Sequence, residues 1–254
     1  MKLLNKIIPF LTSAAVFVLL EILLFFPKSI YWVVVSALFL VILAIFQITG
    51  RFIIKNSFLN LITTPIFLIS GGFMFLVFLE NVLLRHFIAL AIVLLIFAIL
   101  QSVTLKFNFR HKYQPHSLDN IISHTNSLSV FLISSGFFSF LIFLAVSSGL
   151  LFALFGAFIF LITIQLLWFS ETSIKSGWPF LFVITVLMVE IFWAVIYLPT
   201  SIYVNAMILT LSYYLISGIL KNWLLGIREN RVIKRYLIVS AASLIIILAT
   251  AKWF

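Results

Sequence analysis

Hydrophobic positions form long runs along the chain, separated by short stretches that hold most of the charged residues, prolines and asparagines. Because a helix needs roughly 20 apolar residues to cross a bilayer, each run is long enough for one membrane span. The runs lie near residues 7–26, 29–48, 58–79, 83–104, 123–145, 149–169, 178–198, 201–220 and 233–252. The pattern predicts an all-α polytopic transmembrane helical bundle of about nine spans, forming a single transmembrane domain over residues 1–254.

Composition points to lipid as the medium around these runs. Hydrophobic residues make up 65% of the 254 residues and charged residues 9%, whereas soluble domains have roughly 45–50% and about 25%. A water-soluble fold of this length has no way to hide that surplus. The longest gaps between runs, near 105–120 and 221–232, leave no room for a soluble domain. Cysteine is absent, which excludes disulfides and thiolate-bound metals.

Positive charge is sorted between the two ends of the predicted spans. If the spans alternate in direction, thirteen of the sixteen Lys and Arg residues fall on one side. Cytoplasmic loops carry this excess in membrane proteins. We therefore expect a cytoplasmic N-terminus, an outside C-terminus and a multi-pass protein of the cell (inner, cytoplasmic) membrane. The net charge of +10 is then explained by topology and by attraction to anionic lipids of the bilayer, without a nucleic-acid partner.

Two segments of the chain have similar amino-acid sequences. Phe67-Leu-Ile-Ser-Gly-Gly-Phe73 returns as Phe131-Leu-Ile-Ser-Ser-Gly-Phe137, 64 residues later. One interpretation is four helical hairpins in parallel orientation plus a ninth closing helix, since parallel repeats occur in some transporters. The alternative is a chance similarity, because Phe, Leu and Ile are abundant in this chain.

Two acidic residues lie inside predicted spans, where a charge costs at least about 2.5–3.5 kcal/mol unless it is paired or hydrated. Glu190 lies near the middle of the seventh span, and Glu21 lies one to two turns from the outer end of the first. Their carboxyls are candidates for binding a proton, a cation or a headgroup amine. The structural alternative is a hydrogen bond that holds neighbouring helices together.

Further polar and aromatic residues follow Glu190 in the seventh and eighth spans. Asn205, Leu209 and Tyr213 share one helical stripe, and Tyr214 is adjacent to it. This stripe can line a cavity beside the seventh span, with Trp193 as a wall. Ordinary hydrogen bonding between helices explains the same residues equally well. The candidate intramembrane polar site is therefore Glu190, Glu21, Trp193, Asn205, Tyr213 and Tyr214.

Basic residues in two polar stretches are predicted to contact anionic lipid at the cytoplasmic face, where each contributes about 1 kcal/mol. These residues are Lys106, Arg110, Lys112, Arg228, Arg231, Lys234 and Arg235. His111, His116 and His124 follow no metal-ligand spacing, so neither a metal nor another cofactor is expected.

No catalytic or nucleotide-binding motif is found in the sequence, and we do not expect an enzyme. Two functions stay open. The first is a small-solute or lipid-handling transporter with a polar site around Glu190. The alternative is a non-catalytic structural or assembly subunit of a membrane complex, with another membrane protein as its partner.

Five stretches of the sequence carry a resemblance: Glu190-Ile-Phe-Trp193, the segment 197–205, Leu211-Ser-Tyr-Tyr214, Thr250-Ala-Lys-Trp253 and Lys112-Tyr-Gln-Pro-His-Ser-Leu118. With them the chain resembles a family of uncharacterised multi-span integral membrane proteins of candidate-phylum (patescibacterial) bacteria. The resemblance covers most of the chain. It implies a multi-span helical bundle and brings no activity with it.

Overall fold

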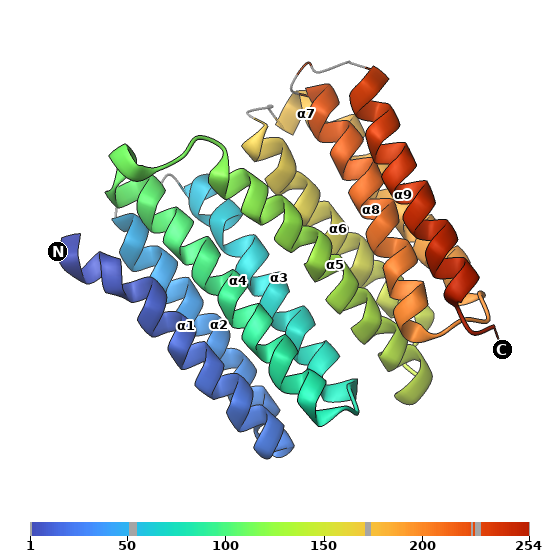
Figure 1. Ribbon diagram of the computed structural model, residues 1–254, viewed down its shortest axis with the longest axis horizontal. Coiled ribbons are helices and arrows are strands. Elements are labelled where there is room, and N and C mark those ends of the chain that lie inside the picture. The colour runs from blue at the N-terminus through green and yellow to red at the C-terminus, as the bar shows by residue number, and fades with distance from the viewer. Residues whose placement is uncertain (1, 51–54, 171–173, 225, 227–229, 254) are drawn as a thin grey trace. The chain divides into compact units, whose positions relative to one another are not determined.

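A computed structural model of the protein describes residues 2–50, 55–170, 174–224, 226 and 230–253. Across these residues the regular secondary structure is helical, and nine α-helices are long and apolar enough to cross a membrane (Figure 1). They are α1 (Lys2–Phe25), α2 (Ile30–Thr49), α3 (Lys55–Phe78), α4 (Val82–Asn108), α5 (Ser117–Phe143), α6 (Ser148–Phe169), α7 (Ile174–Ile196), α8 (Ile202–Leu224) and α9 (Asn230–Thr250). The prediction of an all-α polytopic membrane bundle is confirmed.

Several helices extend past the apolar runs that predicted them, α4 and α9 among them. α4 continues to Asn108, where the run was expected to end near residue 104, and α9 begins at Asn230 rather than near residue 233. Basic side chains allow this extension because their long aliphatic stems lie along the helix while their charged ends reach water. Lys106 and Arg231 are therefore helical residues, not loop residues.

Local signals in the sequence set the shortest connections. Pro27 opens a single 3-10 turn, η1 (Pro27–Ser29), directly before α2. Asn81 caps α4, because its side-chain oxygen accepts a hydrogen bond from the Leu84 amide at 3.1 Å. Gly50 ends α2 with a φ of 65°, a conformation that costs glycine little.

The chain divides into two compact units, Met1–Ser129 and Val130–Phe254, with the boundary inside α5. In the first unit α1 packs against α2 and α4, and α2 and α3 both pack against α4. Hydrogen bonds of polar side chains also connect α3 with α5 and α4 with α2. Thr64 donates a buried hydrogen bond to Asn126 at 2.8 Å, and the Asn108 amide donates to the Ile48 carbonyl at 2.9 Å.

Phenylalanine fills the core of the second unit. The fully buried ring of Phe192, on α7, is stacked on Phe155 of α6 with ring centres 4.7 Å apart. It also lies 5.1 Å from the ring of Phe138 and 5.6 Å from that of Phe152. Aromatic pairs of this kind contribute about 0.5–1.5 kcal/mol beyond simple burial. The centre of this unit is thus a packed aromatic cluster.

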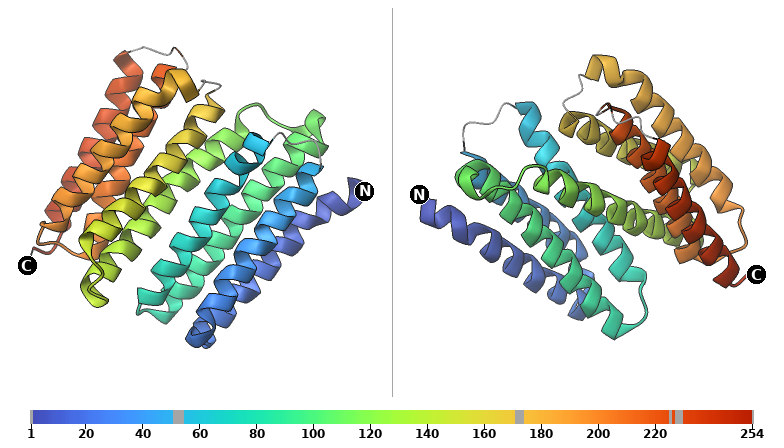
Figure 2. Two further views of the ribbon diagram at one scale, coloured as in Figure 1. Left: turned by 180° about the vertical axis from the view of Figure 1, so that it is seen from behind. Right: turned by 45° about the horizontal axis from the view of Figure 1, so that its top comes forward.

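The last helix is attached to the rest of the second unit along one side. α9 packs beside α8, and the two run side by side in every view (Figure 2). Gly218 of α8 lies so close to the Tyr236 ring that an added Cβ would overlap it. Within α9, whose residues are all described, only Ser240 is buried. α9 therefore presents most of its apolar surface to its surroundings.

Candidate intramembrane site

Exposed side chains recur every three or four residues along α7 and form one continuous face. We call this the α7 outer face, and its members are Phe182, Val183, Val186, Leu187, Glu190, Trp193, Ala194 and Tyr197. Glu190 is its one charged member. Every other residue on this face suits contact with acyl chains or, for Trp193 and Tyr197, with the membrane interface.

Glu190 lies well inside the membrane-spanning part of α7. It is six residues before the end of the span at Ile196, which is about 9 Å along the helix. Side chains on a helix lean toward its N-terminus, so the Glu190 side chain leans away from the nearer end of the span. A bilayer that covers this span therefore puts the carboxyl at the depth of hydrocarbon rather than of headgroups.

Glu190 makes no hydrogen bond or ion pair with any residue that the structure describes. The described basic residues of the second unit lie elsewhere. Lys175 is in the first turn of α7, far along the helix from Glu190, and Lys221 is in the last turn of α8. Arg231, Lys234 and Arg235 are in the first turns of α9, and Lys252 follows α9. Among the side chains that the structure describes in this unit, no Lys or Arg pairs with the Glu190 carboxyl.

The chain matches no protein-family model, no curated protein and no solved structure. What the protein does is therefore inferred from the chemistry and exposure of its own residues.

Of the other residues predicted around Glu190, Trp193 shares its exposed face, but the α8 residues do not. Asn205 and Tyr213 of α8 are buried, 6% and 3% exposed, while Trp193 is 55% exposed on the α7 outer face. Asn205 accepts a hydrogen bond from Thr200 at 2.5 Å, and the Tyr213 hydroxyl bonds Ser217. Asn205 and Tyr213 thus have their partners within α8 or the turn before it.

Tyr214 turns toward the last helix. Its ring lies 5.2 Å from the ring of Tyr236 on α9, at a tilt of 45°. Together with the close approach at Gly218, this pair fixes α9 against α8. The predicted site residues of the second unit therefore separate into an exposed pair on α7, a buried pair on α8 and a tyrosine that packs on α9.

Glu21 belongs to the first unit and has a partner that the sequence did not suggest. Its carboxylate lies 3.0 Å from Nδ1 of His86, joining α1 to α4 near the end where α1 finishes and α4 begins. Both side chains are partly exposed. The sequence analysis did not pair His86 with Glu21 because 65 residues separate them. The feature that could have indicated the pair is that His86 lies one turn into the fourth predicted span, at the same depth in the membrane as Glu21.

We expect the Glu21–His86 contact to be a helix-to-helix tie worth about 1 kcal/mol. A double-mutant cycle of Glu21→Leu and His86→Leu, followed by unfolding in mixed micelles, measures that coupling. The matched control replaces His124, an exposed histidine with no hydrogen bond to the described residues, and should give additive effects with Glu21→Leu. If the changes in unfolding free energy caused by Glu21→Leu and His86→Leu were also additive, the two side chains would not stabilise each other, which would contradict this prediction.

The basic residues predicted to meet anionic lipid lie near helix ends. The Lys106 ammonium of α4 is 6.0 Å from the centre of the Tyr113 ring. Arg110 begins the 3-10 turn η3 (Arg110–Lys112), Lys112 is exposed, and Arg228 lies outside the described residues. Arg231, Lys234 and Arg235 are exposed on α9. Among the described residues no three His, Asp or Glu side chains gather closely enough to hold a metal ion.

Proposed function

We propose that this integral membrane protein is a non-catalytic assembly subunit, which binds a helix of another membrane protein through the α7 outer face. The observation that carries the proposal is the exposed carboxyl of Glu190, about 9 Å inside the span and without a partner among the described residues.

Electrostatics identify the kind of partner that this face fits. A charged residue exposed to hydrocarbon costs about 2.5–3.5 kcal/mol near the bilayer centre. A Lys or Arg on a neighbouring helix at the same depth removes that cost by pairing with the carboxylate. The flanking members of the face, Leu187 and Ala194, present apolar surface one turn to either side for helix packing. The proposed occupant is therefore a transmembrane helix that carries a basic residue.

A transporter with its site at Glu190 would need this residue to face water instead of a partner helix. Transport requires the carboxyl to line a water-filled cavity together with other polar groups. Asn205 and Tyr213, the polar residues expected beside it, are buried and hydrogen-bonded near or within α8. We therefore favour assembly over transport.

The proposal includes residence in the inner (cytoplasmic) membrane with the N-terminus in the cytoplasm. The sorting of Lys and Arg to one side of the spans supports it. Compartment-specific reporters fused to the two ends are expected to report opposite compartments.

Photo-crosslinking in native membranes tests the proposed interface. A photoreactive amino acid at position 187 or 194, on the α7 outer face, is expected to crosslink to one other protein. The same reagent at Ile245 or Ile246, exposed apolar residues of α9, is expected to capture lipid. Support requires the captured helix to contain Lys or Arg, and Glu190→Lys combined with a Glu at that partner position to restore the crosslink. Lipid adducts at every position, or capture of a second copy of this chain, would refute the proposal.

A further inference from the structure

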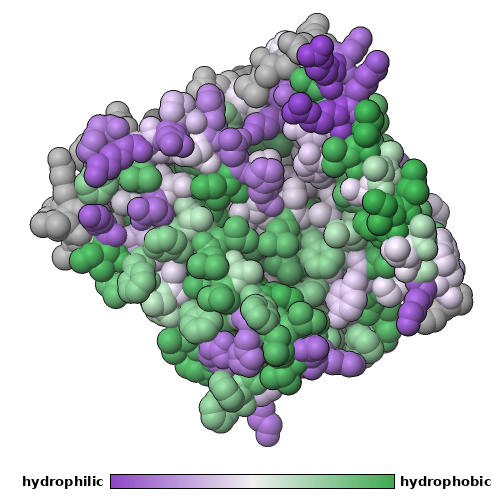
Figure 3. Space-filling view, viewed as in Figure 1, coloured by the Kyte–Doolittle hydropathy of each residue, from purple (hydrophilic) through white to green (hydrophobic). Residues whose placement is uncertain are grey.

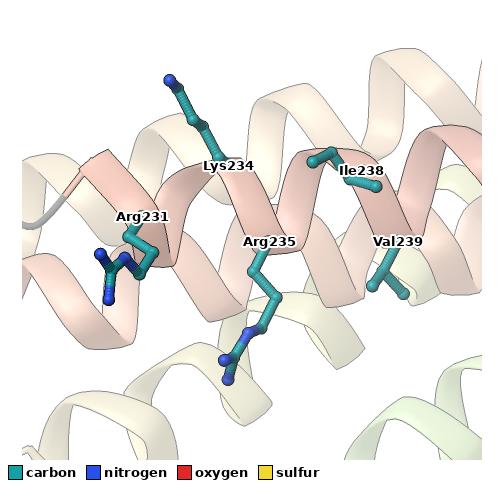
Figure 4. A pocket seen from close by; sticks show the side chains of 5 residues that line it. All are labelled: Arg231, Lys234, Arg235, Ile238 and Val239. Atoms are coloured by element: carbon teal, nitrogen blue, oxygen red, sulfur yellow. The ribbon is translucent and has the colours of Figure 1, made fainter.

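An open cavity of about 460 Å³ lies beside the first turns of α9. Its lining consists of three basic residues and two aliphatic ones, Arg231, Lys234, Arg235, Ile238 and Val239 (Figure 4). Among the described residues no acidic side chain is part of the lining, so none of them neutralises the three positive charges within the cavity.

The spacing of these residues puts all five on one side of α9. At 100° per residue they cover an arc of about 140°. Arg231 and Arg235 are one turn apart, and their guanidinium groups extend from the same edge of the helix, while Lys234 extends from the other edge (Figure 4). Ile238 and Val239 follow one turn further along, 66% and 44% exposed. The cations therefore precede the aliphatic surface in the direction that leads into the membrane.

Hydrophilic side chains also gather at this end of the helix in the space-filling view, with hydrophobic side chains along the shafts of α8 and α9 (Figure 3). Because α9 is long and apolar enough to span a membrane, its first turns lie where headgroups meet acyl chains. Guanidinium groups bind phosphate through paired hydrogen bonds. Exposed aliphatic residues one turn deeper match the position of an acyl chain.

We propose that Arg231 and Arg235 bind the phosphate of an anionic glycerophospholipid, with Lys234 adding positive charge and with Ile238 and Val239 contacting its acyl chain. This is a defined site for one lipid, beyond a general attraction of basic residues to an anionic surface. It does not depend on the α7 outer face, which lies on another helix.

Binding of phosphatidylglycerol to the full-length protein in micelles, followed by native mass spectrometry, tests the site. Arg231→Gln combined with Arg235→Gln is expected to weaken binding roughly 25-fold, since each basic residue contributes about 1 kcal/mol. The matched control, Lys252→Gln, removes a positive charge that follows the other end of α9 and should change binding less than twofold. Arg231→Lys with Arg235→Lys keeps the charge but loses the paired hydrogen bonds, so binding should be intermediate.

Three results would overturn the proposal. One is unchanged phosphatidylglycerol binding by the double Gln variant when its thermal unfolding matches that of the unaltered protein. Another is equal binding of phosphatidylcholine, which carries no net charge. The third is full competition by glycerol phosphate, which would identify a site for free phosphate compounds instead of a lipid.

Discussion

Glu190→Leu is expected to stabilise the isolated protein while abolishing its assembly with the partner. Removing an unpaired carboxyl from an exposed position in hydrocarbon relieves a cost of about 2–3 kcal/mol. The same change removes the group that pairs with the partner's basic residue, so the complex should no longer form. Unfolding of the purified protein in mixed micelles measures the first effect. The size of the complex extracted from native membranes measures the second.

These two opposite effects separate an interface from an internal role. If Glu190 held helices of its own chain together, Glu190→Leu would lower the stability of the isolated protein instead of raising it. A matched control is Val186→Leu, one turn away on the same face, which alters shape without altering charge. Val186→Leu should leave stability within about 0.5 kcal/mol of the unaltered protein, as exposed substitutions usually do.

Phe192→Ala is expected to destabilise the second unit by about 3 kcal/mol. The Phe192 ring is fully buried and contacts the rings of Phe138, Phe152 and Phe155. Its removal leaves a cavity in the aromatic cluster, for which globular proteins lose about 3–5 kcal/mol. The lower end of that range applies because part of the usual cost comes from water, and packing rather than water holds helices together in lipid.

The adjacent residue provides the control for this substitution. Trp193 is also aromatic but is 55% exposed on the α7 outer face, so Trp193→Ala should cost less than about 1 kcal/mol. Hydrogen exchange resolves where each effect falls: Phe192→Ala should raise exchange in α6 and α7, with α1 and α2 unchanged. Equal destabilisation by the two substitutions would show that the aromatic cluster is not the core of this unit.

The nine spans were predictable because hydrophobic run length alone decides whether a segment crosses a bilayer. The ends of α4 and α9 were not, since charged residues mark the limit of the hydrocarbon and not the limit of the helix. Lys106 and Arg231 continue the helical turn into the interface, where water and headgroups solvate their charged ends.

The sequence predicted how deep in the membrane Glu190 lies, but not to which side of α7 its side chain points. The position of Glu190 within its span follows from counting residues along the chain. Which way its side chain faces depends on which neighbours cover the other sides of α7, and those contacts join residues far apart in sequence. The same limit applies to Glu21, whose partner His86 lies 65 residues away.

The surroundings of position 190 in the isolated protein provide the most direct test of these conclusions. The chain has no cysteine, so Glu190→Cys can carry a single spin label after reconstitution into bilayers. We predict strong relaxation by oxygen, which dissolves in hydrocarbon, and weak relaxation by a water-soluble nickel complex. Strong relaxation by nickel would show a water-filled cavity, and weak relaxation by both would show a buried residue; either result would contradict an interface on the α7 outer face.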